Sequence, residues 1–531
     1  MQYCPKKAKI NINGDGRRID IDSKKKKEGN EMKANYESVN TYVEVCKAIG
    51  QSMVECRLNG TDVRTVLLTE PRASLEQATC DNGEVRYSGK LTVSFLYENT
   101  DGELCRAERG AEFFHKAEDA QIATAHVATG ELTVLSVKTK REGGQIVVAC
   151  VVEGAFTVRG DSRQSYLSGG EDLLVKKTPM LFCSEYVGSA TVEESDEFEC
   201  DFTQDVLLHV ETATVTDVRA GVGEAEIYGE VYLHFCALRQ DGSLCAYERL
   251  TPIKAQVPLD AVMPQMPVTG RIRILSTQVA ATADESRGRS KIAVSYRVEV
   301  AATAYERQEI EVGTDAYSTT VEVGLKTQKV AGRYALNTKT LTERIHGAAI
   351  LSAETTEGKN LLASVFPKAN ATAQKTEQGW SIEGVIEGKA LYRLEGGGAE
   401  AVDISLPFAF PISEELNAEV ECGECAVYGF SLRVRADGNA EAEATIKVGY
   451  VSYLSTEASF LCEVTEGEKK AEKTNAISVY VGRRGDDLWT TAKRLSLTPE
   501  GLQESEPALT FPLTGEERIL IYRRKRENLE K

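Results

Sequence analysis

The side chains that most often bind metals or act as nucleophiles are scattered through this chain without a recognisable arrangement. Its five histidines lie between His115 and His346, and none stands at metal-ligand spacing from another. No Gly-x-Ser-x-Gly elbow is present, and Glu357-Gly358-Lys359 lacks the upstream glycine of a phosphate-binding loop. We therefore predict no catalytic, cofactor-binding or metal-binding residues, and we expect that the protein is not an enzyme.

The single CxxC pattern is Cys422-Gly423-Glu424-Cys425. A structural zinc site would need a second pair of ligands, which the sequence does not offer. A redox site would be expected near a strand–helix–strand pattern, whereas this stretch lies among β segments. We interpret the pair as incidental. The chain has 13 cysteines, an odd number, and their scatter indicates reduced, mostly buried thiols, as in a cytosolic protein.

Residues 477 to 522 have the spacing of a compact strand–helix–helix–strand unit. Ile477 to Val481 alternates apolar and polar residues, which is typical of a half-buried strand. Gly485 favours a tight turn, the aspartates after it can cap a helix, and Pro499 suits the first turn of a second helix. We expect Trp489 and Leu495 in the core of this unit. The apolar residues at helical spacing are Leu488, Ala492 and Leu495.

This unit resembles the LysM domain, which usually binds N-acetylglucosamine chains through the loop after its first strand and the loop before its last. The family most often has Asn followed by Pro in the second loop, where this chain has Glu506. A carboxylate offers only acceptors, whereas an amide also offers donors, so the resemblance favours protein docking over glycan binding. The implied binding loops are Gly485, Asp486, Asp487 and Leu488, then Glu506, Pro507 and Ala508.

With 531 residues, 42% of them hydrophobic and 27% charged, the chain is long enough for several globular domains. Its net charge of −18 makes it a poor binder of nucleic acid, which needs clustered lysine and arginine. The basic segment 1–32, with Lys24 to Lys27, is interpreted as a solvated tail; docking to an acidic surface is the alternative. No stretch has the apolar character of a secretory signal or a transmembrane helix, so we expect a cytoplasmic protein.

Three copies of one β pattern occupy the long central region. Each copy contains a glycine at the same register, namely Gly89, Gly229 and Gly384, which are separated by 140 and 155 residues. A second glycine follows 13 residues later in every copy, as expected for a hairpin turn. This spacing is too long for a solenoid repeat and indicates whole domains in tandem. Apolar residues of the first copy alternate with polar ones: Leu91, Val93, Phe95 and Tyr97.

We therefore predict a mainly β fold, with three tandem antiparallel domains of sandwich or barrel type followed by a small α+β unit in βααβ order. The predicted segments are 1–32, 33–180, 185–325, 330–465 and 475–524. Glu466 to Lys470 is expected to be a charged linker before the last unit, and Glu193 to Glu197 a solvated linker. Tyr36 to Met53 fits either a strand or a helix, and Leu341 to Leu351 fits a short helix.

Tandem β domains with this register, followed by a LysM-like unit, resemble the SPOCS-domain (DUF3794) sporulation proteins of clostridia, specifically the SpoIVA-interacting protein L family. The resemblance covers most of residues 33 to 523. The residues that carry it are Gly89, Tyr97, Gly102, Phe113 and Phe114 in the first copy and Gly384, Tyr392, Gly397, Pro407 and Phe408 in the third.

The resemblance implies a non-enzymatic spore-coat assembly factor that acts in the mother-cell cytoplasm at the forespore surface. Its partner would be a SpoIVA-type coat ATPase, docked by the LysM-like unit, with other coat proteins as further partners. One alternative is a cell-wall protein that binds peptidoglycan through this unit, and another is an enzyme that the unit targets. The lack of an export signal counts against the first alternative, and the lack of a catalytic arrangement counts against the second.

Overall fold

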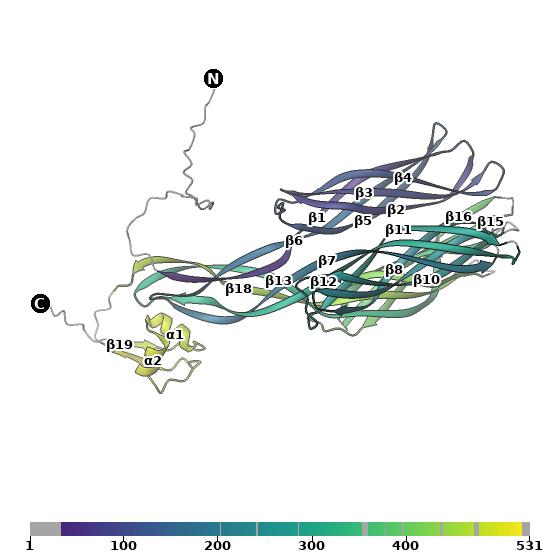
Figure 1. The fold of residues 1–531 in the computed structure, drawn as a ribbon. Helices are drawn as coiled ribbons and strands as arrows, with labels where there is room; N and C mark the ends of the chain where they lie inside the picture. Colours follow the sequence, from purple (N-terminus) through teal and green to yellow (C-terminus); the bar gives the residue numbers. More distant parts are fainter. Residues whose placement is uncertain are drawn as a thin grey trace, which may run out of the picture.

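The computed structural model describes residues 33–201, 203–239, 243–284, 286–352, 359–377, 379–395, 398–435, 439–471 and 477–522. The basic segment 1–32 lies outside these described residues. Strands make up most of the described chain, they pair antiparallel, and the two helices in it are short (Figure 1). The predicted mainly β, antiparallel fold class is therefore confirmed.

The long strands fall into three consecutive units of six, named here units 1, 2 and 3. Unit 1 comprises β1 (Ala34–Asn59), β2 (Val63–Asp81), β3 (Glu84–Asn99), β4 (Leu104–Glu118), β5 (Val127–Glu142) and β6 (Gln145–Gly170). Unit 2 comprises β7 (Leu174–Asp201), β8 (Thr203–Ala220), β9 (Glu224–Arg239), β10 (Leu244–Pro258), β11 (Val268–Asp284) and β12 (Arg289–Tyr317). Unit 3 comprises β13 (Val321–Leu351), β14 (Lys359–Thr376), β15 (Gly379–Leu394), β16 (Ala399–Ile412), β17 (Glu419–Val434) and β18 (Ala440–Lys469).

The strands follow the same order in every unit. The sixth strand pairs with the first and the fifth, and the third strand pairs with the second and the fourth, giving β1-β6-β5 with β2-β3-β4 in unit 1 and β11-β12-β7 with β10-β9-β8 in unit 2. In unit 3 the pairing of β13 with β16 joins all six strands into one sheet, β14-β15-β16-β13-β18-β17. Its two edge strands, β14 and β17, lie close together, so the sheet is a nearly closed barrel.

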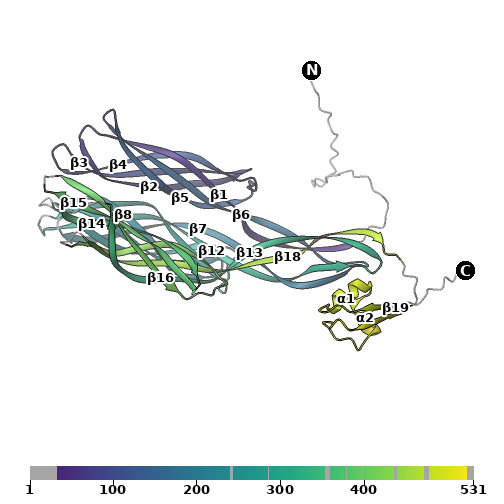
Figure 2. The same cartoon turned by 180° about the vertical axis from the view of Figure 1, so that it is seen from behind.

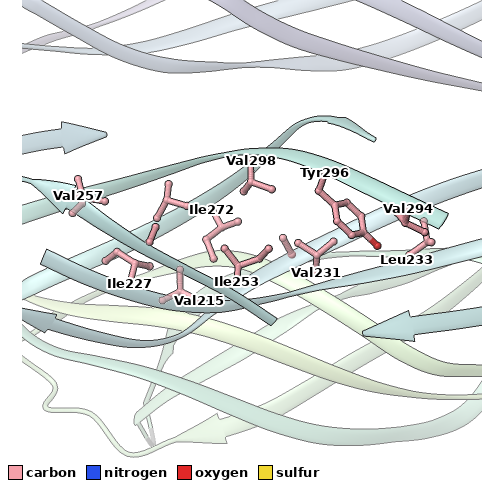
Figure 3. Packing of buried hydrophobic residues seen from close by; sticks show 14 of the residues in the cluster. Val215, Ile227, Val231, Leu233, Ile253, Val257, Ile272, Val294, Tyr296 and Val298 are labelled. Carbon is pink, nitrogen blue, oxygen red and sulfur yellow. The ribbon is translucent and has the colours of Figure 1, made fainter. Parts of the chain in front are cut away.

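Each unit has its own hydrophobic core, formed by the inward-facing residue of every second position along the strands. In unit 2, Val231 and Leu233 of β9 point inward, as do Ile253 of β10, Ile272 of β11 and Tyr296 of β12 (Figure 3). All five side chains are nearly inaccessible to solvent. Burial of this kind stabilises a fold by about 25 cal/mol per Å² of apolar surface.

The first and last strands of each unit are longer than the other four and continue beyond the barrel as a two-stranded ribbon (Figures 1 and 2). The three ribbons pack together into a stalk. Its apolar interior receives side chains from every unit, including Val39 of β1, Phe182 of β7 and Phe460 of β18. The stalk is therefore built jointly by units 1, 2 and 3.

The three barrels meet around an apolar cluster to which each unit contributes corresponding residues. Leu96, Cys236 and Leu391 are buried there, and each is the seventh residue after the repeat glycine of its unit. The paired strands β2, β8 and β14 each bulge at a corresponding leucine beside this cluster, namely Leu67, Leu207 and Leu362. The units are thus arranged around an approximate three-fold axis within a single chain.

Several predicted linkers and boundaries lie inside strands, and these predictions are corrected. Glu193 to Glu197 belongs to β7 and pairs with β12, while Glu466 to Lys469 forms the end of β18. Leu341 to Leu351 is the last part of β13 and not a helix, and Tyr36 to Met53 is strand. The predicted limits at 180–185 and 325–330 fall within the stalk ribbons. Local polarity misled the prediction because the outward-facing positions of these strands carry polar or charged side chains while the backbone pairs with a neighbouring strand.

The remaining unit lies beside the far end of the stalk (Figures 1 and 2). It consists of β19 (Ile477–Val481), α1 (Leu488–Leu495), α2 (Pro499–Ser505) and β20 (Arg518–Tyr522), and β19 pairs antiparallel with β20. Its core, with Ala492, Leu502 and Ile519, continues into Tyr317 at the end of β12. Neither helix in the described part of the chain is long and apolar enough to cross a bilayer.

Candidate functional site

The loop between β19 and α1 is joined to the loop before β20 by backbone hydrogen bonds. Gly485 has a φ of +87°, a conformation that glycine adopts without strain. Its N–H donates to the carbonyl of Leu513 across 2.8 Å, and the N–H of Leu513 donates to the carbonyl of Asp486 across 2.9 Å. The two loops that the sequence marked for binding are therefore held in a fixed relative position.

Asp487 begins the first helix and carries a persistent negative charge. Its side chain accepts a hydrogen bond from the N–H of Thr490 at 2.7 Å, as an N-cap residue does. The hydrogen bonds from Thr490, together with the ammonium group of Lys176 at 3.0 Å, lower the pKa of Asp487 to about 2. The neighbouring Asp486 pairs instead with Arg494 of α1. Both loop aspartates are thus already engaged within the chain.

The outer face of α1 is docked on the stalk. The indole N–H of Trp489 donates to Asp315 across 2.8 Å, and Lys493 pairs with the other carboxylate oxygen of Asp315 at 2.5 Å. The ring of Trp489 also packs edge-to-face on Tyr317, with ring centres 4.9 Å apart. The hydroxyl of Tyr317 donates to the carbonyl of Leu497 at 2.7 Å. These contacts fix the orientation of the unit relative to β12.

The structure therefore gives the two expected core residues different places. Leu495 is buried inside the unit. Trp489 is half-buried: it packs against the core cluster of the unit, and its indole N–H and its ring also contact the stalk. The surroundings of Trp489 are thus shared between the unit and the stalk, because Asp315 and Tyr317 come from a strand that ends 172 residues before it.

An open groove of about 680 Å³ lies beside this contact. Most of the residues that line the groove are apolar or aromatic. The ion pair between Lys176 and Asp487 forms the charged part of the lining. Such a wall can hold an aliphatic or aromatic side chain, or the apolar face of a sugar ring. The lining residues are Lys176, Asp487, Leu488, Trp489, Pro499, Phe511 and Pro512.

Residues of the predicted second loop do not line this groove. Glu506 ends α2, and its carboxylate accepts a hydrogen bond from the N–H of Leu520 at 3.0 Å, so it covers the backbone of β20. Pro507 and Ala508 form an exposed turn. The second wall of the groove is supplied by Phe511 and Pro512, which lie a few residues further along the same loop.

Sequence reasoning missed two kinds of groove residue. The Phe511-Pro512 pair could have been found, since an aromatic residue followed by proline directly before a buried leucine suggests a rigid wall. The sequence contains no pattern that predicts the contacts of Lys176 or of the stalk residues that hold α1. These residues are far from the unit in the sequence and lie beside it only in the folded chain. The first predicted loop contributes Asp487 and Leu488 to the groove, whereas Gly485 and Asp486 shape the loop behind it.

The outer face of the two-stranded sheet is apolar, and its side chains are exposed within the described part of the chain. Ile477, Val479 and Val481 are each between 56% and 59% exposed, and Leu520 lies opposite Val479 on β20. The opposite face of the sheet carries Ile519 and packs against the helices. The unit therefore presents a row of β-branched side chains to solvent at the end of the stalk.

The CxxC pair lies far from this unit, on a bulged part of β17. Burial raises the pKa of Cys422 to about 11 and that of Cys425 to about 12, so both thiols remain protonated at neutral pH. Glu424 between them forms an ion pair with Arg271 of unit 2, which also pairs with Glu131 of unit 1. The bulge thus serves the contact between units.

Among the described residues no group of three or more His, Cys, Asp or Glu could hold a metal ion.

The geometry defines a mainly β protein of antiparallel units, with a small βααβ unit docked at the end of a stalk. Comparison with known proteins gives no relative: no protein-family model, no curated protein and no solved structure matches the chain.

Proposed function

We propose that the protein is a non-enzymatic spore-coat assembly factor of the kind its sequence resembles. In this proposal units 1 to 3 are SPOCS-type repeats, and the βααβ unit is a LysM-type docking module. The partner is a SpoIVA-type coat ATPase at the forespore surface, in the mother-cell cytoplasm, with other coat proteins as further partners. The stalk supports this proposal, because it carries the docking unit away from the barrels and leaves the barrels accessible to other proteins.

The observation that carries the proposal is the apolar outer face of β19 and β20. Exposed apolar side chains that gather on one face are typical of surfaces that a partner protein covers. Val479 and Leu520 stand at the centre of this face, and β19 and β20 pair only with each other among the described strands. A partner can therefore cover the face with apolar side chains and extend the sheet by backbone pairing along β19, since Glu506 already occupies the N–H of Leu520 on β20.

The groove favours a second candidate, which is recognition of peptidoglycan. Its position between the two loops is the position at which LysM domains hold N-acetylglucosamine, and Trp489 and Phe511 can contact a sugar ring. Two observations support the docking proposal over this one. The carboxylate of Glu506 is used by the backbone of β20, and Asp487 is already paired with Lys176.

A binding experiment with the full chain separates these two functions. The chain is offered to the purified SpoIVA-type ATPase and, in parallel, to peptidoglycan sacculi. Val479→Lys places a charge on the outer sheet face, Phe511→Ala removes one wall of the groove, and Ala508→Lys is a matched control that adds the same charge to an exposed turn.

Under the docking proposal the ATPase retains the wild-type chain, and Val479→Lys weakens this binding by at least about tenfold, since a charge buried at an interface without a partner is costly. Ala508→Lys and Phe511→Ala leave the affinity for the ATPase within about twofold. Retention by sacculi alone, with loss in Phe511→Ala, would overturn the docking proposal in favour of peptidoglycan recognition.

A further inference from the structure

Unit 1 carries a row of apolar side chains on the outer surface of its barrel. Met53 of β1 lies directly opposite Val151 of β6, and Val151 lies opposite Ser136 of β5, beside the bulged Leu135. Met53 is 74% exposed and Leu135 is 50% exposed, while Val151 between them is half-buried. The row therefore runs across three neighbouring strands, perpendicular to them.

Phe114 extends the row onto a fourth strand. It lies on β4, which is the neighbour of β1 on the other side, and its side chain is 80% exposed. The two strands approach closely here, because a Cβ atom placed on Gly50 of β1 would lie 2.4 Å from the carbonyl oxygen of Lys116 on β4. In order across the barrel, the row is Phe114, Met53, Val151 and Leu135.

The other two units show that the fold does not require large apolar residues at the positions of Phe114, Met53 and Val151. In each unit the repeat glycine lies opposite one residue of the neighbouring fourth strand. The next residue along that strand is Phe114 in unit 1, Lys254 in unit 2 and Ala409 in unit 3. The cross-strand pair that corresponds to Met53 with Val151 is Glu193 with Arg297 in unit 2 and Arg344 with Thr445 in unit 3. At the places of Phe114, Met53 and Val151 the outer surface thus carries charged, polar or small side chains in units 2 and 3 and large apolar ones in unit 1 alone. The place of Leu135 is apolar in every unit, with Leu275 in unit 2 and Phe430 in unit 3. A role in folding does not explain that difference, since all three units form the same strands.

The charges around the row are of both signs and are paired within the chain. Arg57 pairs with Glu55 on β1 at 3.3 Å, and Lys116 pairs with Glu118 on β4 at 2.5 Å. Elsewhere the protein is strongly acidic, with a net charge of −18, so most surfaces of two copies repel each other. This face is locally balanced, which makes it a surface on which a second copy of the same chain can approach.

We propose that the row Phe114–Met53–Val151–Leu135 is the centre of a two-fold symmetric interface between two copies of this chain. A two-fold axis between Met53 and Val151 reverses the row, so Phe114 of one copy faces Leu135 of the other and Met53 faces Val151. Each contact then joins a larger side chain to a smaller one, as in sheets that pack face to face about 10 Å apart. Because each chain has one such row, the assembly closes as a dimer and does not continue into a fibre. This inference is independent of the proposed function.

The test is the mass of the full chain in solution, measured by sedimentation velocity over concentrations up to about 100 µM, a range in which a modest interface associates. Met53→Glu with Phe114→Lys gives unit 1 the residues that unit 2 carries at the same places, so the variant is expected to fold. The matched control is Glu193→Lys in unit 2, which changes charge at the corresponding position without touching the row. We expect a dimer for the wild type and the control and a monomer for the double variant, with unchanged far-UV circular dichroism.

A gain-of-function variant tests the closure argument separately. Glu193→Met with Lys254→Phe builds a second apolar row on unit 2, and we expect species larger than a dimer. The proposal is overturned if the wild type remains monomeric throughout the concentration range, or if the double variant in unit 1 still forms the dimer while its circular dichroism is native.

Discussion

The indole nitrogen of Trp489 and a carboxylate oxygen of Asp315 are 2.8 Å apart, which joins the C-terminal unit to a strand that precedes it by more than 150 residues. The same carboxylate receives Lys493, and the tryptophan ring lies against Tyr317. The unit is therefore a fixed continuation of the stalk. This arrangement sets the position of the groove and of the apolar sheet face that partners would meet.

Trp489→Ala is expected to release the unit from the stalk without unfolding it. The substitution removes the hydrogen bond to Asp315, and a bond to a charged group contributes about 1.5–3 kcal/mol. Small-angle scattering should show a larger radius of gyration, and limited proteolysis should cut sooner between unit 3 and the C-terminal unit. Trp489→Phe, which keeps a ring against Tyr317 but lacks the donor, should give an intermediate result. Loss of the helical signal in Trp489→Ala would contradict this assignment of the tryptophan to the interface.

Leu495→Ala, in contrast, is expected to destabilise the unit itself. Leu495 is buried among Ala492, Leu502 and Ile519, and truncating a buried leucine costs about 2–5 kcal/mol. Thermal unfolding can be followed by the fluorescence of Trp489 in a Trp380→Phe background, because the chain has only these two tryptophans. Leu520→Ala, on the partly exposed sheet face, is the control and should shift the transition much less. Equal shifts in the two variants would mean that the inner and outer faces of the unit are misassigned.

The fold class could be predicted from the sequence because alternation of period two is a local signal. The apolar residues Val231, Leu233 and Phe235 stand at every second position, and this local pattern alone predicts a strand. The repeat glycines Gly89 and Gly229 also mark corresponding strands, β3 and β9, since each stands at a fixed distance from its hairpin. The stalk could not be predicted, because its ribbons are defined by pairing across more than 100 residues, and their exposed faces look like polar linkers.

The candidate site likewise contains some residues whose roles the local sequence predicts and others whose roles it does not. The immediate neighbours predict that Asp486 or Asp487 caps the first helix, and the structure makes Asp487 the cap and places it at the groove. The LysM resemblance places Glu506 in a binding loop, and in the structure its carboxylate accepts a hydrogen bond from the N–H of Leu520. Lys176 and Asp315 reach the unit only through the length and direction of β7 and β12, which no local pattern encodes.

Acid should destabilise the C-terminal unit through Asp487. Its folded pKa of about 2 lies below the ordinary value of 3.8, so the stabilisation is present above pH 4 and is lost as pH falls from about 4 to about 2. The measurement is the unfolding temperature of the unit, followed through Trp489, across this range. Asp487→Ser keeps a capping side chain without a charge and should show a weaker pH dependence. Glu517, whose pKa is also lowered to about 2 by hydrogen bonds from Thr514, is present in both proteins, so their difference reports Asp487. Identical pH dependence in the two proteins would contradict the role of the aspartate charge.

Glu185 is expected to be the most sensitive charged residue at the junction of barrels and stalk. One carboxylate oxygen pairs with Arg159 of unit 1 at 3.0 Å and the other with Arg333 of unit 3 at 2.8 Å, so a single residue of unit 2 joins all three units. Glu185 and Arg159 are both buried, and removing one partner of a buried pair leaves an uncompensated charge. Glu185→Gln should therefore lower the free energy of unfolding by about 3–5 kcal/mol.

The matched control for this substitution is Glu457→Gln, which removes an exposed pair with Lys329 elsewhere on the stalk. Exposed pairs contribute about 1 kcal/mol or less, so its urea midpoint should stay close to that of the wild type. Far-UV circular dichroism in urea measures both variants under one condition. If Glu185→Gln shifts the urea midpoint no further than Glu457→Gln, the apolar clusters of the stalk and barrels alone stabilise the junction. The ion pairs of Glu185 with Arg159 and Arg333 then orient the three units without adding to the free energy of unfolding.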